Sequence, residues 1–234
     1  MKENNPLIEI RDLQKLYFRK NAASIKALDG ISFEVFHGEF LAIIGRSGSG
    51  KTTLLNLIGT LDQPTSGEVR LEGKILSNLF NRELATVRRE KIGFIFQTFN
   101  LLPALTVFEN VESALIHSRM SKDRMKSKIL AMLDALALSE MSDRLPLELS
   151  VGQRQKVAIV RALIKDPAVI LADEPTGEMD PITSRQIMEK LSELNRKSKI
   201  TLIVASHGSS MLSEASRALF IKNGKIVSQS DAGY

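Results

Sequence analysis

The stretch FLAIIGRSGSGKTTLLNLIG, residues 40–59, decides the fold. An apolar run leads into a glycine-rich turn, and the turn leads into a second apolar segment. The sequence therefore predicts a strand, a loop and a helix in that order. The loop matches the pattern G-x-x-x-x-G-K-[ST] at Gly45, Gly50, Lys51 and Thr52. Glycines let a backbone wrap closely around phosphate oxygens, and a helix N-terminus faces the anion, so the stretch predicts a site for a nucleoside triphosphate with Mg²⁺.

Single side chains of this loop have separate expected roles. Lys51 is expected to reach the β- and γ-phosphates, and the Thr52 hydroxyl is expected to hold Mg²⁺. The expected nucleotide contacts are Gly45, Arg46, Ser47, Gly48, Ser49, Gly50, Lys51, Thr52 and Thr53.

Strand and helix patterns on both sides of the loop predict an α/β fold. Apolar or alternating runs predict strands over residues 7–13, 30–45 (two runs), 66–76, 91–97, 168–174 and 201–206, and a hairpin over 218–229. Helices are predicted over 81–90 and 181–197, and over most of 105–166. Strands that alternate with helices indicate a core with a parallel sheet, into which the block near 100–165 is inserted as a helical subdomain.

Composition is that of an ordinary globular protein of 234 residues, with a net charge of +5 and no cysteine. The absence of cysteine excludes disulfide and thiolate chemistry. No secretory signal and no membrane-spanning apolar run is found, so the chain itself is expected to be soluble. The positive charge is scattered and RNA-binding aromatic signatures are absent, so nucleic acid is not expected as a partner.

A pair of acidic residues ends the apolar run AVILADE, residues 168–174. A carboxylate at the end of a buried strand is costly unless it meets a cation or a donor. With a phosphate loop upstream, Asp173 is expected to hold Mg²⁺ through water. Glu174 is expected to polarise an attacking water as a general base.

The order of the motifs resembles that of the ABC-type ATPases across essentially the whole chain. The matching positions are Gly45–Thr52, Gln97, Leu149–Gln153, Val169–Glu174, Asp180 and His207. The segment GFIFQTFNLLPALTVFENV, residues 93–111, is most similar to the lipoprotein-release and macrolide-export branch. The resemblance implies one ABC ATPase domain over 1–234: a P-loop NTPase (RecA-like) core with an N-terminal antiparallel β subdomain from 1–97 and 166–234, and a helical subdomain over about 98–165.

The resemblance also implies roles for matching residues. Tyr17 stands where family members stack an aromatic ring on adenine. Gln97 would touch Mg²⁺ or the attacking water, and it marks the hinge to the helical subdomain, where the membrane partner docks. Asp180 falls in a loop that crosses a dimer interface. His207 would contact the γ-phosphate and hold the water of Glu174.

Family members work as head-to-tail dimers, in which the LS-x-GQ segment of one subunit covers the ATP of the other. Ser150, Gly152 and Gln153 are therefore expected to contact ATP across the interface. The spacing of Ser150 and Gln153 is also that of a capping box, which on its own is worth only about 1 kcal/mol of helix stability.

Three positions depart from the family pattern. Val151 replaces a glycine in LS-x-GQ, Gly208 follows His207 where an aspartate is more common, and Glu178-Met179 replaces a small residue and leucine. None of these changes removes a group with a chemical role, so ATP binding and hydrolysis are expected to be retained. A binding-only switch whose hydrolysis has lapsed through Val151 stays open as an alternative.

The leading interpretation is the ATPase subunit of a membrane transporter or mechanotransmission complex, cytoplasmic and peripheral on the inner face of the membrane. Its partners would be a separate permease and a second ATPase subunit, identical or different, and its task export or release. A DNA-repair or chromosome ATPase is disfavoured, because such heads place a long coiled coil between the phosphate loop and LS-x-GQ, and no sustained heptads occur here.

Overall fold

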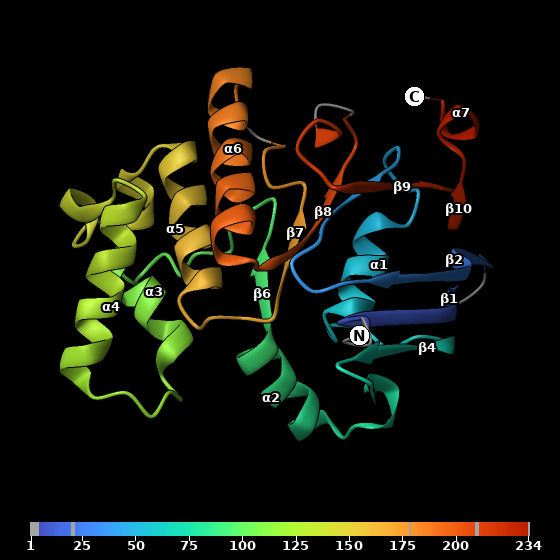
Figure 1. Ribbon diagram of the computed structural model, residues 1–234, viewed down its shortest axis with the longest axis horizontal. Helices are drawn as coiled ribbons and strands as arrows, with labels where there is room; N and C mark the ends of the chain where they lie inside the picture. The colour runs from blue at the N-terminus through green and yellow to red at the C-terminus, as the bar shows by residue number, and fades with distance from the viewer. Residues whose placement is uncertain (1–4, 20–21, 178, 209–210, 234) are drawn as a thin grey trace.

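The computed structural model describes residues 5–19, 22–177, 179–208 and 211–233, and two β-sheets form its centre (Figure 1). The strands are β1 (Ile8–Arg19), β2 (Ala22–Val35), β3 (Phe40–Ile44), β4 (Ser66–Leu71), β5 (Lys74–Ile75), β6 (Ile92–Ile95), β7 (Val169–Asp173), β8 (Thr201–Ser206), β9 (Arg217–Lys222) and β10 (Lys225–Val227). The helices are α1 (Lys51–Ile58), α2 (Asn81–Lys91), α3 (Val107–Glu112), α4 (Lys122–Ala135), α5 (Val151–Leu163), α6 (Pro181–Ser198) and α7 (Gln229–Ala232). Single 3₁₀ turns lie at Leu76–Asn78, Ser113–Leu115, Ser139–Met141 and Pro146–Glu148.

The two sheets differ in strand direction. Within the described residues, the antiparallel sheet has the order β2-β1-β4-β5, and the other sheet has the order β10-β9-β3-β8-β7-β6. In the second sheet the strands from β9 to β6 run parallel, and β10 runs antiparallel at the edge. The predicted α/β fold, with a parallel sheet and an antiparallel β portion, is confirmed.

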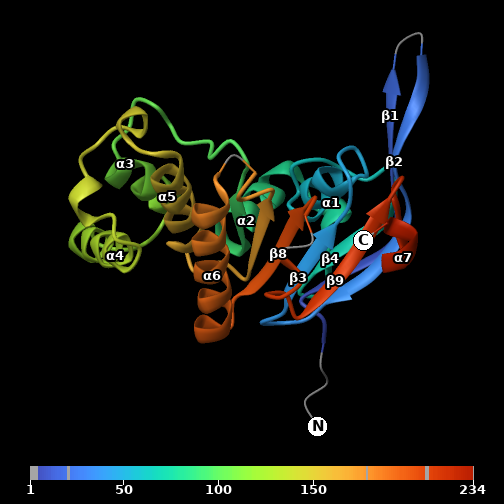
Figure 2. The same cartoon turned by 90° about the horizontal axis from the view of Figure 1, so that it is seen from above.

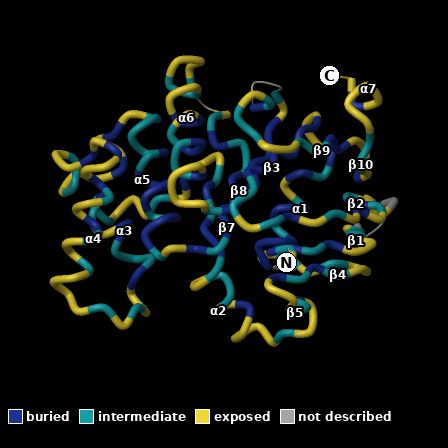
Figure 3. The backbone as a smooth tube through the Cα atoms, in the orientation of Figure 1, coloured by how far each residue is buried: buried dark blue, intermediate teal, exposed yellow. Residues whose placement is uncertain are grey.

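The parallel sheet is covered on both faces, which explains why its strands read as continuous apolar runs. On β3, Leu41 and Ile43 face one cluster of buried side chains, whereas Phe40 faces another. On β8, Ile203 faces the first of these clusters and Leu202 faces the second. Figure 3 shows the buried backbone that results along these central strands.

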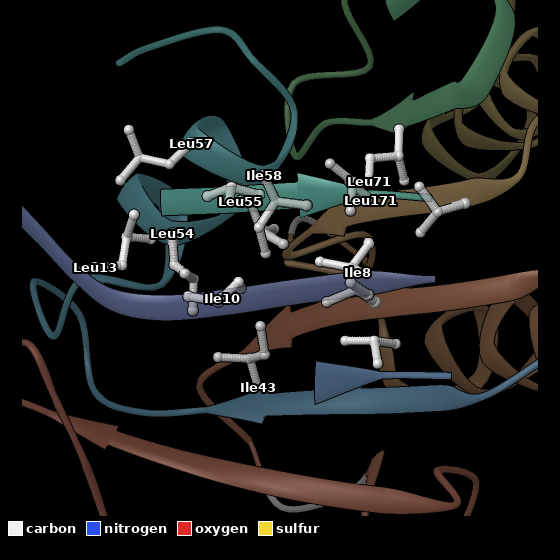
Figure 4. Packing of buried hydrophobic residues seen from close by; sticks show 14 of the residues in the cluster. Ile8, Ile10, Leu13, Ile43, Leu54, Leu55, Leu57, Ile58, Leu71 and Leu171 are labelled. Carbon is white, nitrogen blue, oxygen red and sulfur yellow. The ribbon is translucent and has the colours of Figure 1, made fainter. Parts of the chain in front are cut away.

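One face of the parallel sheet packs against α1 and the antiparallel sheet. Ile8 and Ile10 of β1 meet Leu54 of α1 and Ile43 of β3 in one apolar cluster (Figure 4). Their side chains are at most 2% exposed, so large-to-small changes here would cost about 2–5 kcal/mol. This packing fixes α1, and with it the loop that precedes α1.

Helix α5 joins the sheet core to the helices at the other end of the molecule (Figure 2). Ile159 and Leu163 pack in the cluster on the second face of the parallel sheet, together with residues of α6. Val157 and Val160 pack instead with α3 and α4 in a cluster of their own. The middle and C-terminal half of α5 are therefore held by two groups of apolar contacts, and the helix extends from them to its start at Val151.

Two segments differ from the sequence-based expectation. The strand predicted over 7–13 extends as β1 to Arg19, and β2 begins at Ala22 rather than near Gly30. Among the described residues of the two strands, four register shifts interrupt the pairing of β1 with β2, and each shift breaks the alternation on which the prediction depended. The short C-terminal helix α7 was not predicted.

The predicted C-terminal hairpin is confirmed as β9 and β10. Asn223 and Gly224 have φ values of 49° and 75°, as a two-residue turn of the primed kind requires. A Cβ on Gly224 would lie 2.7 Å from the carbonyl oxygen of Ala27, so the hairpin turn contacts β2 directly.

Candidate nucleotide-binding site

The loop between β3 and α1 has the backbone shape that its glycines permit. Gly48 and Gly50 have φ values of 75° and 111°, and Gly50 caps the helix that begins at Lys51. A Cβ on Gly45 would lie 2.4 Å from the carbonyl oxygen of Ile221, and a Cβ on Gly50 would lie 2.5 Å from that of Ala27. Both positions therefore require glycine for steric reasons as well.

A cavity of about 940 Å³ opens over this loop. Its lining combines the loop with parts of β2, the ends of β6, β7 and β8, and the C-terminal hairpin. The lining residues are Ile25, Lys26, Ala27, Arg46, Ser47, Gly48, Gly50, Lys51, Thr52, Thr53, Gln97, Glu174, His207, Asn223, Gly224 and Gly233. Sequence reasoning missed the contributions of β2 and the hairpin, because no local motif marks residues brought in by tertiary packing.

Lys51 is the buried cation of the cavity, with a relative exposure of 6%. Its Nζ donates to the carbonyl oxygen of Gly45 at 2.7 Å and to that of Arg46 at 3.3 Å. The same atom lies 3.5 Å from Oε1 of Glu174. The ammonium is therefore anchored at the base of the loop and already faces an anionic oxygen.

Glu174 lies between two of the predicted site residues. Its Oε2 is 2.8 Å from Nδ1 of His207 and also accepts a hydrogen bond from the His207 backbone N–H. β7 and β8 are adjacent and parallel, so the residues that follow them meet at the same edge of the sheet. Glu174 has a φ of 45°, a conformation that costs a non-glycine residue free energy and that recurs at functional sites.

Asp173 and Thr52 form a second polar pair beside the loop. Burial raises the pKa of Asp173, a hydrogen bond from Thr52 opposes the rise, and the charge of Glu174 adds to it. Its Oδ1 is buried and has no hydrogen-bond partner among the described residues. An orphaned carboxylate oxygen beside a hydroxyl is a fitting ligand pair for a hard cation.

The described residues hold no cluster of three or more His, Cys, Asp or Glu side chains that could bind a metal by themselves. At phosphate sites in general, Mg²⁺ is held by one or two protein oxygens together with water and phosphate.

Gln97 follows β6 and lines the cavity. A Cβ on Gly177 would lie 3.2 Å from its Nε2, so glycine at 177 leaves room for the amide. Two residues further on, Phe99 and Asn100 have φ values of 60° and 47°. The loop after Gln97 therefore has an unusual backbone conformation, which contacts from other parts of the chain must stabilise.

Arg161 of α5 holds this loop. Its guanidinium donates to the carbonyl oxygen of Phe99 at 2.7 Å and to that of Asn100. The Arg161 side chain is half-buried, and this burial lowers its pKa. Sequence reasoning missed Arg161, because more than 60 residues separate it from the loop that it supports.

Tyr17 does not line the cavity. It is 38% exposed, and its hydroxyl donates to Oδ2 of Asp62 at 3.0 Å. It pairs across the hairpin with Ile25, which does line the cavity. The ring lies beside the cavity, and its contact with adenine stays a prediction.

The LS-x-GQ segment also lies outside the cavity lining. Ser150 caps α5: its Oγ accepts from the N–H of Gln153, and the Gln153 side chain accepts from the N–H of Ser150 at 2.8 Å. Figure 2 shows α5 and α1 at separate places along the molecule. Within this chain the segment therefore forms the expected capping box but does not reach the phosphate loop.

A close contact inside the chain also involves Gly152. A Cβ at that position would lie 2.8 Å from Cγ2 of Thr183 on α6. Asp180 caps the same helix by accepting from the N–H groups of Ile182 and Thr183, both at 3.0 Å. The start of α5 and the start of α6 thus lie against each other.

The departures from the family pattern cause no visible strain where the structure describes them. Val151 is the first residue of α5, is half-buried, and does not have a positive φ. The N–H of Gly208 donates to Oγ of Ser206 at 3.2 Å. Met179 packs at the edge of the apolar cluster of α6, and Glu178 lies outside the described residues.

A glycine loop between a buried parallel strand and a helix, with Lys51 inside it and acidic residues ending a nearby strand, defines a P-loop nucleoside triphosphatase. The profile of the ABC transporter family matches residues 28–177. The chain belongs to this family, and it is an ATP-binding and ATP-hydrolysing subunit.

Similar proteins agree with this assignment. The chain is 44% identical to an uncharacterised ABC transporter ATP-binding protein of Thermotoga maritima, over 94% of this chain and 93% of that protein. It is 42% identical to the macrolide export ATP-binding/permease protein MacB of Hyphomonas neptunium, over 96% of this chain but only 35% of that longer protein. A dimeric structure of the ATP-binding cassette MJ0796 in a post-hydrolysis state, bound to ADP and Pi, superposes with a TM-score of 0.87 at 39% identity, covering 94% of this chain and 97% of that one.

Proposed function

We propose that this chain forms a head-to-tail dimer around two ATP molecules and drives a separate permease in export or release. The main observation in favour of this proposal is that the expected ATP-contacting residues of one chain lie in two separate places. Lys51, Glu174 and His207 meet at one cavity, whereas the LS-x-GQ segment of the same chain lies elsewhere. A second subunit would supply the LS-x-GQ segment that covers the nucleotide.

The cavity supports hydrolysis by in-line attack of water on the γ-phosphorus. Lys51 binds the β- and γ-phosphates and exchanges its contact with Glu174 for phosphate oxygens. The Glu174 carboxylate, released from the ammonium, accepts a proton from the attacking water. His207, which hydrogen-bonds Glu174, orients that carboxylate and contacts the γ-phosphate.

Thr52, Asp173 and Gln97 are the residues that would hold Mg²⁺. The orphaned Oδ1 of Asp173 and the hydroxyl of Thr52 are the observations that favour this assignment. Bound there, the ion neutralises charge on the phosphate oxygens. The remaining residues of the phosphate loop, from Gly45 to Thr53, cradle the phosphates with their backbone N–H groups.

The second subunit would contribute Ser150, Gly152, Gln153 and Asp180. The N–H of Gln153 is capped by Ser150, but the N–H groups of Val151 and Gly152 lack an intrahelical acceptor, so they suit a phosphate that is brought to them. The MJ0796 cassette is dimeric in its ADP- and Pi-bound state, which supports this arrangement.

The names of the relatives support a membrane partner. MacB carries a permease in the same chain as its ATP-binding part. Among the residues that the structure describes, we find no helix with the length and hydrophobicity of a membrane span. We assign the helical residues 98–165, next to Gln97, as the region that docks on a separate permease at the cytoplasmic face of the membrane.

Turnover and binding of purified variants test this function. Lys51→Ala should lose ATP binding, and Glu174→Gln should keep binding but lose turnover. Wild-type protein that binds no ATP, or a Lys51→Ala variant with full ATPase activity, would contradict the proposal.

A further inference from the structure

Asp62 is a junction of hydrogen bonds just beyond the phosphate-loop helix. Its Oδ1 accepts from Nζ of Lys15 at 2.6 Å and from the N–H of Gln63, and its Oδ2 accepts from the hydroxyl of Tyr17 at 3.0 Å. Burial acts to raise the pKa of Asp62, but these hydrogen bonds together hold it below its ordinary value. The carboxylate is therefore ionised and oriented at neutral pH.

The same contacts fix the ring of Tyr17 at two points. Its hydroxyl is bound by Asp62, and Nζ of Lys15 stands 5.0 Å from the ring centroid, over one face. The Lys15 side chain is only 12% exposed, and it is held in turn by Asp62 and by the carbonyl oxygen of Gln63. Lys15 covers one face of the ring, and because Tyr17 is still 38% exposed, part of its surface is accessible to another group.

Tyr17 lies on the cavity side of the β1–β2 hairpin. It pairs directly with Ile25, and residues paired across an antiparallel ladder point to the same face of the sheet. Ile25 lines the cavity over the phosphate loop. The ring is thus positioned where the base of a nucleotide bound by its phosphates can reach it.

Asp62 also ties this ring to the helix that binds the phosphates. Helix α1 begins at Lys51 and ends at Ile58, and Asp62 follows four residues later. The same loop holds β1 through Thr65, whose Oγ1 accepts from the N–H of Leu16 at 3.0 Å. The phosphate loop and Tyr17 are therefore attached to opposite ends of one rigid element.

We propose that Asp62, supported by Lys15, is a positioning residue that holds Tyr17 as the platform for the adenine base. This inference rests on the proposed ATP site. A ring that is fixed before binding loses less conformational freedom when the base stacks on it. Asp62 thereby sets the distance between base and phosphates without touching the nucleotide.

The test compares ATP with inorganic tripolyphosphate, which has the phosphates but no base, in titrations with Mg²⁺. Tyr17→Phe removes only the hydroxyl, and Asp62→Ala removes its acceptor. One net hydrogen bond is worth about 0.5–1.5 kcal/mol, so each variant should weaken ATP binding about 2- to 10-fold and leave tripolyphosphate binding unchanged. The double variant should be no weaker than the single ones, because both remove the same interaction.

Thr65→Val is the matched control. It breaks a hydrogen bond at the same junction without touching the ring, so it should lower the melting temperature but not the ratio of the two affinities. Unchanged ATP affinity in Tyr17→Phe, additive losses in the double variant, or equal losses for both ligands would overturn the inference. Wild-type protein that binds neither ligand would overturn the proposed function itself.

Discussion

Two explanations account for glycine at position 152 in the LS-x-GQ segment: packing within the chain and contact with a phosphate of the second subunit. A pair of substitutions distinguishes the two explanations. A Cβ there would lie 2.8 Å from Cγ2 of Thr183 within the same chain. The proposed dimer also brings this backbone against the γ-phosphate of the other subunit. Thr183→Ser deletes the contacting methyl group but keeps the hydroxyl that supports Asp180.

The expected stabilities follow from the contact. Overpacking costs about 1–3 kcal/mol, and alanine gains about 1 kcal/mol over glycine in a helix. Gly152→Ala should therefore destabilise the wild-type chain by about 0–2 kcal/mol. In the Thr183→Ser background the same change should be neutral or stabilising by up to about 1 kcal/mol.

Urea denaturation and ATP turnover are measured on the four proteins of this cycle. If Gly152 serves the phosphate of the second subunit, turnover stays low in Gly152→Ala even when Thr183→Ser has restored stability. Recovery of turnover together with stability would refute the role in trans and leave packing as the whole reason for the glycine.

Other substitutions test separate parts of the site. Val151→Gly should change ATP turnover by less than about threefold, since Val151 has ordinary helical geometry; a rise of 100-fold would favour the binding-only switch. Because burial raises the pKa of Asp173, the folded protein loses stability as the pH rises through that pKa. The melting temperature of Asp173→Asn should therefore exceed that of the wild type at pH 7 and equal it at low pH. The same variant should lose Mg²⁺-dependent ATP binding. A wild-type protein that melts higher than Asp173→Asn at pH 7 without ligand would contradict this. Arg161→Lys cannot bond both carbonyl groups after Gln97 in the same way, so proteolysis near residue 100 should accelerate, and an unchanged rate would argue against that support.

Much of the fold could be predicted because the residues that determine each strand, turn or helix are close together in the sequence. The strand, loop and helix around Lys51 are adjacent in sequence, and the turn at Asn223-Gly224 depends on two residues. The meeting of Glu174 with His207 could be expected because each follows a buried strand, and such strands share one edge in a parallel sheet.

Other features depend on tertiary packing that no local pattern records. Arg161 supports a loop more than 60 residues away, and Asp62 contacts Tyr17 across 45 residues. Because the pairing of β1 with β2 is irregular, the alternation of side chains is interrupted, and the sequence pattern predicted only about half of each strand. The contact between Gly152 and Thr183 could likewise be found only from the packing of α5 against α6.

In the proposed dimer, each of two sites is completed by residues of both chains. Glu174→Gln retains the shape of the side chain but cannot take the proton of water, so ATP should remain bound and hold the subunits together. Size-exclusion chromatography with light scattering, with and without ATP and Mg²⁺, measures this directly. We expect an ATP-dependent dimer for Glu174→Gln that disappears when Lys51→Ala is added. A Glu174→Gln protein that binds ATP and stays monomeric would contradict it.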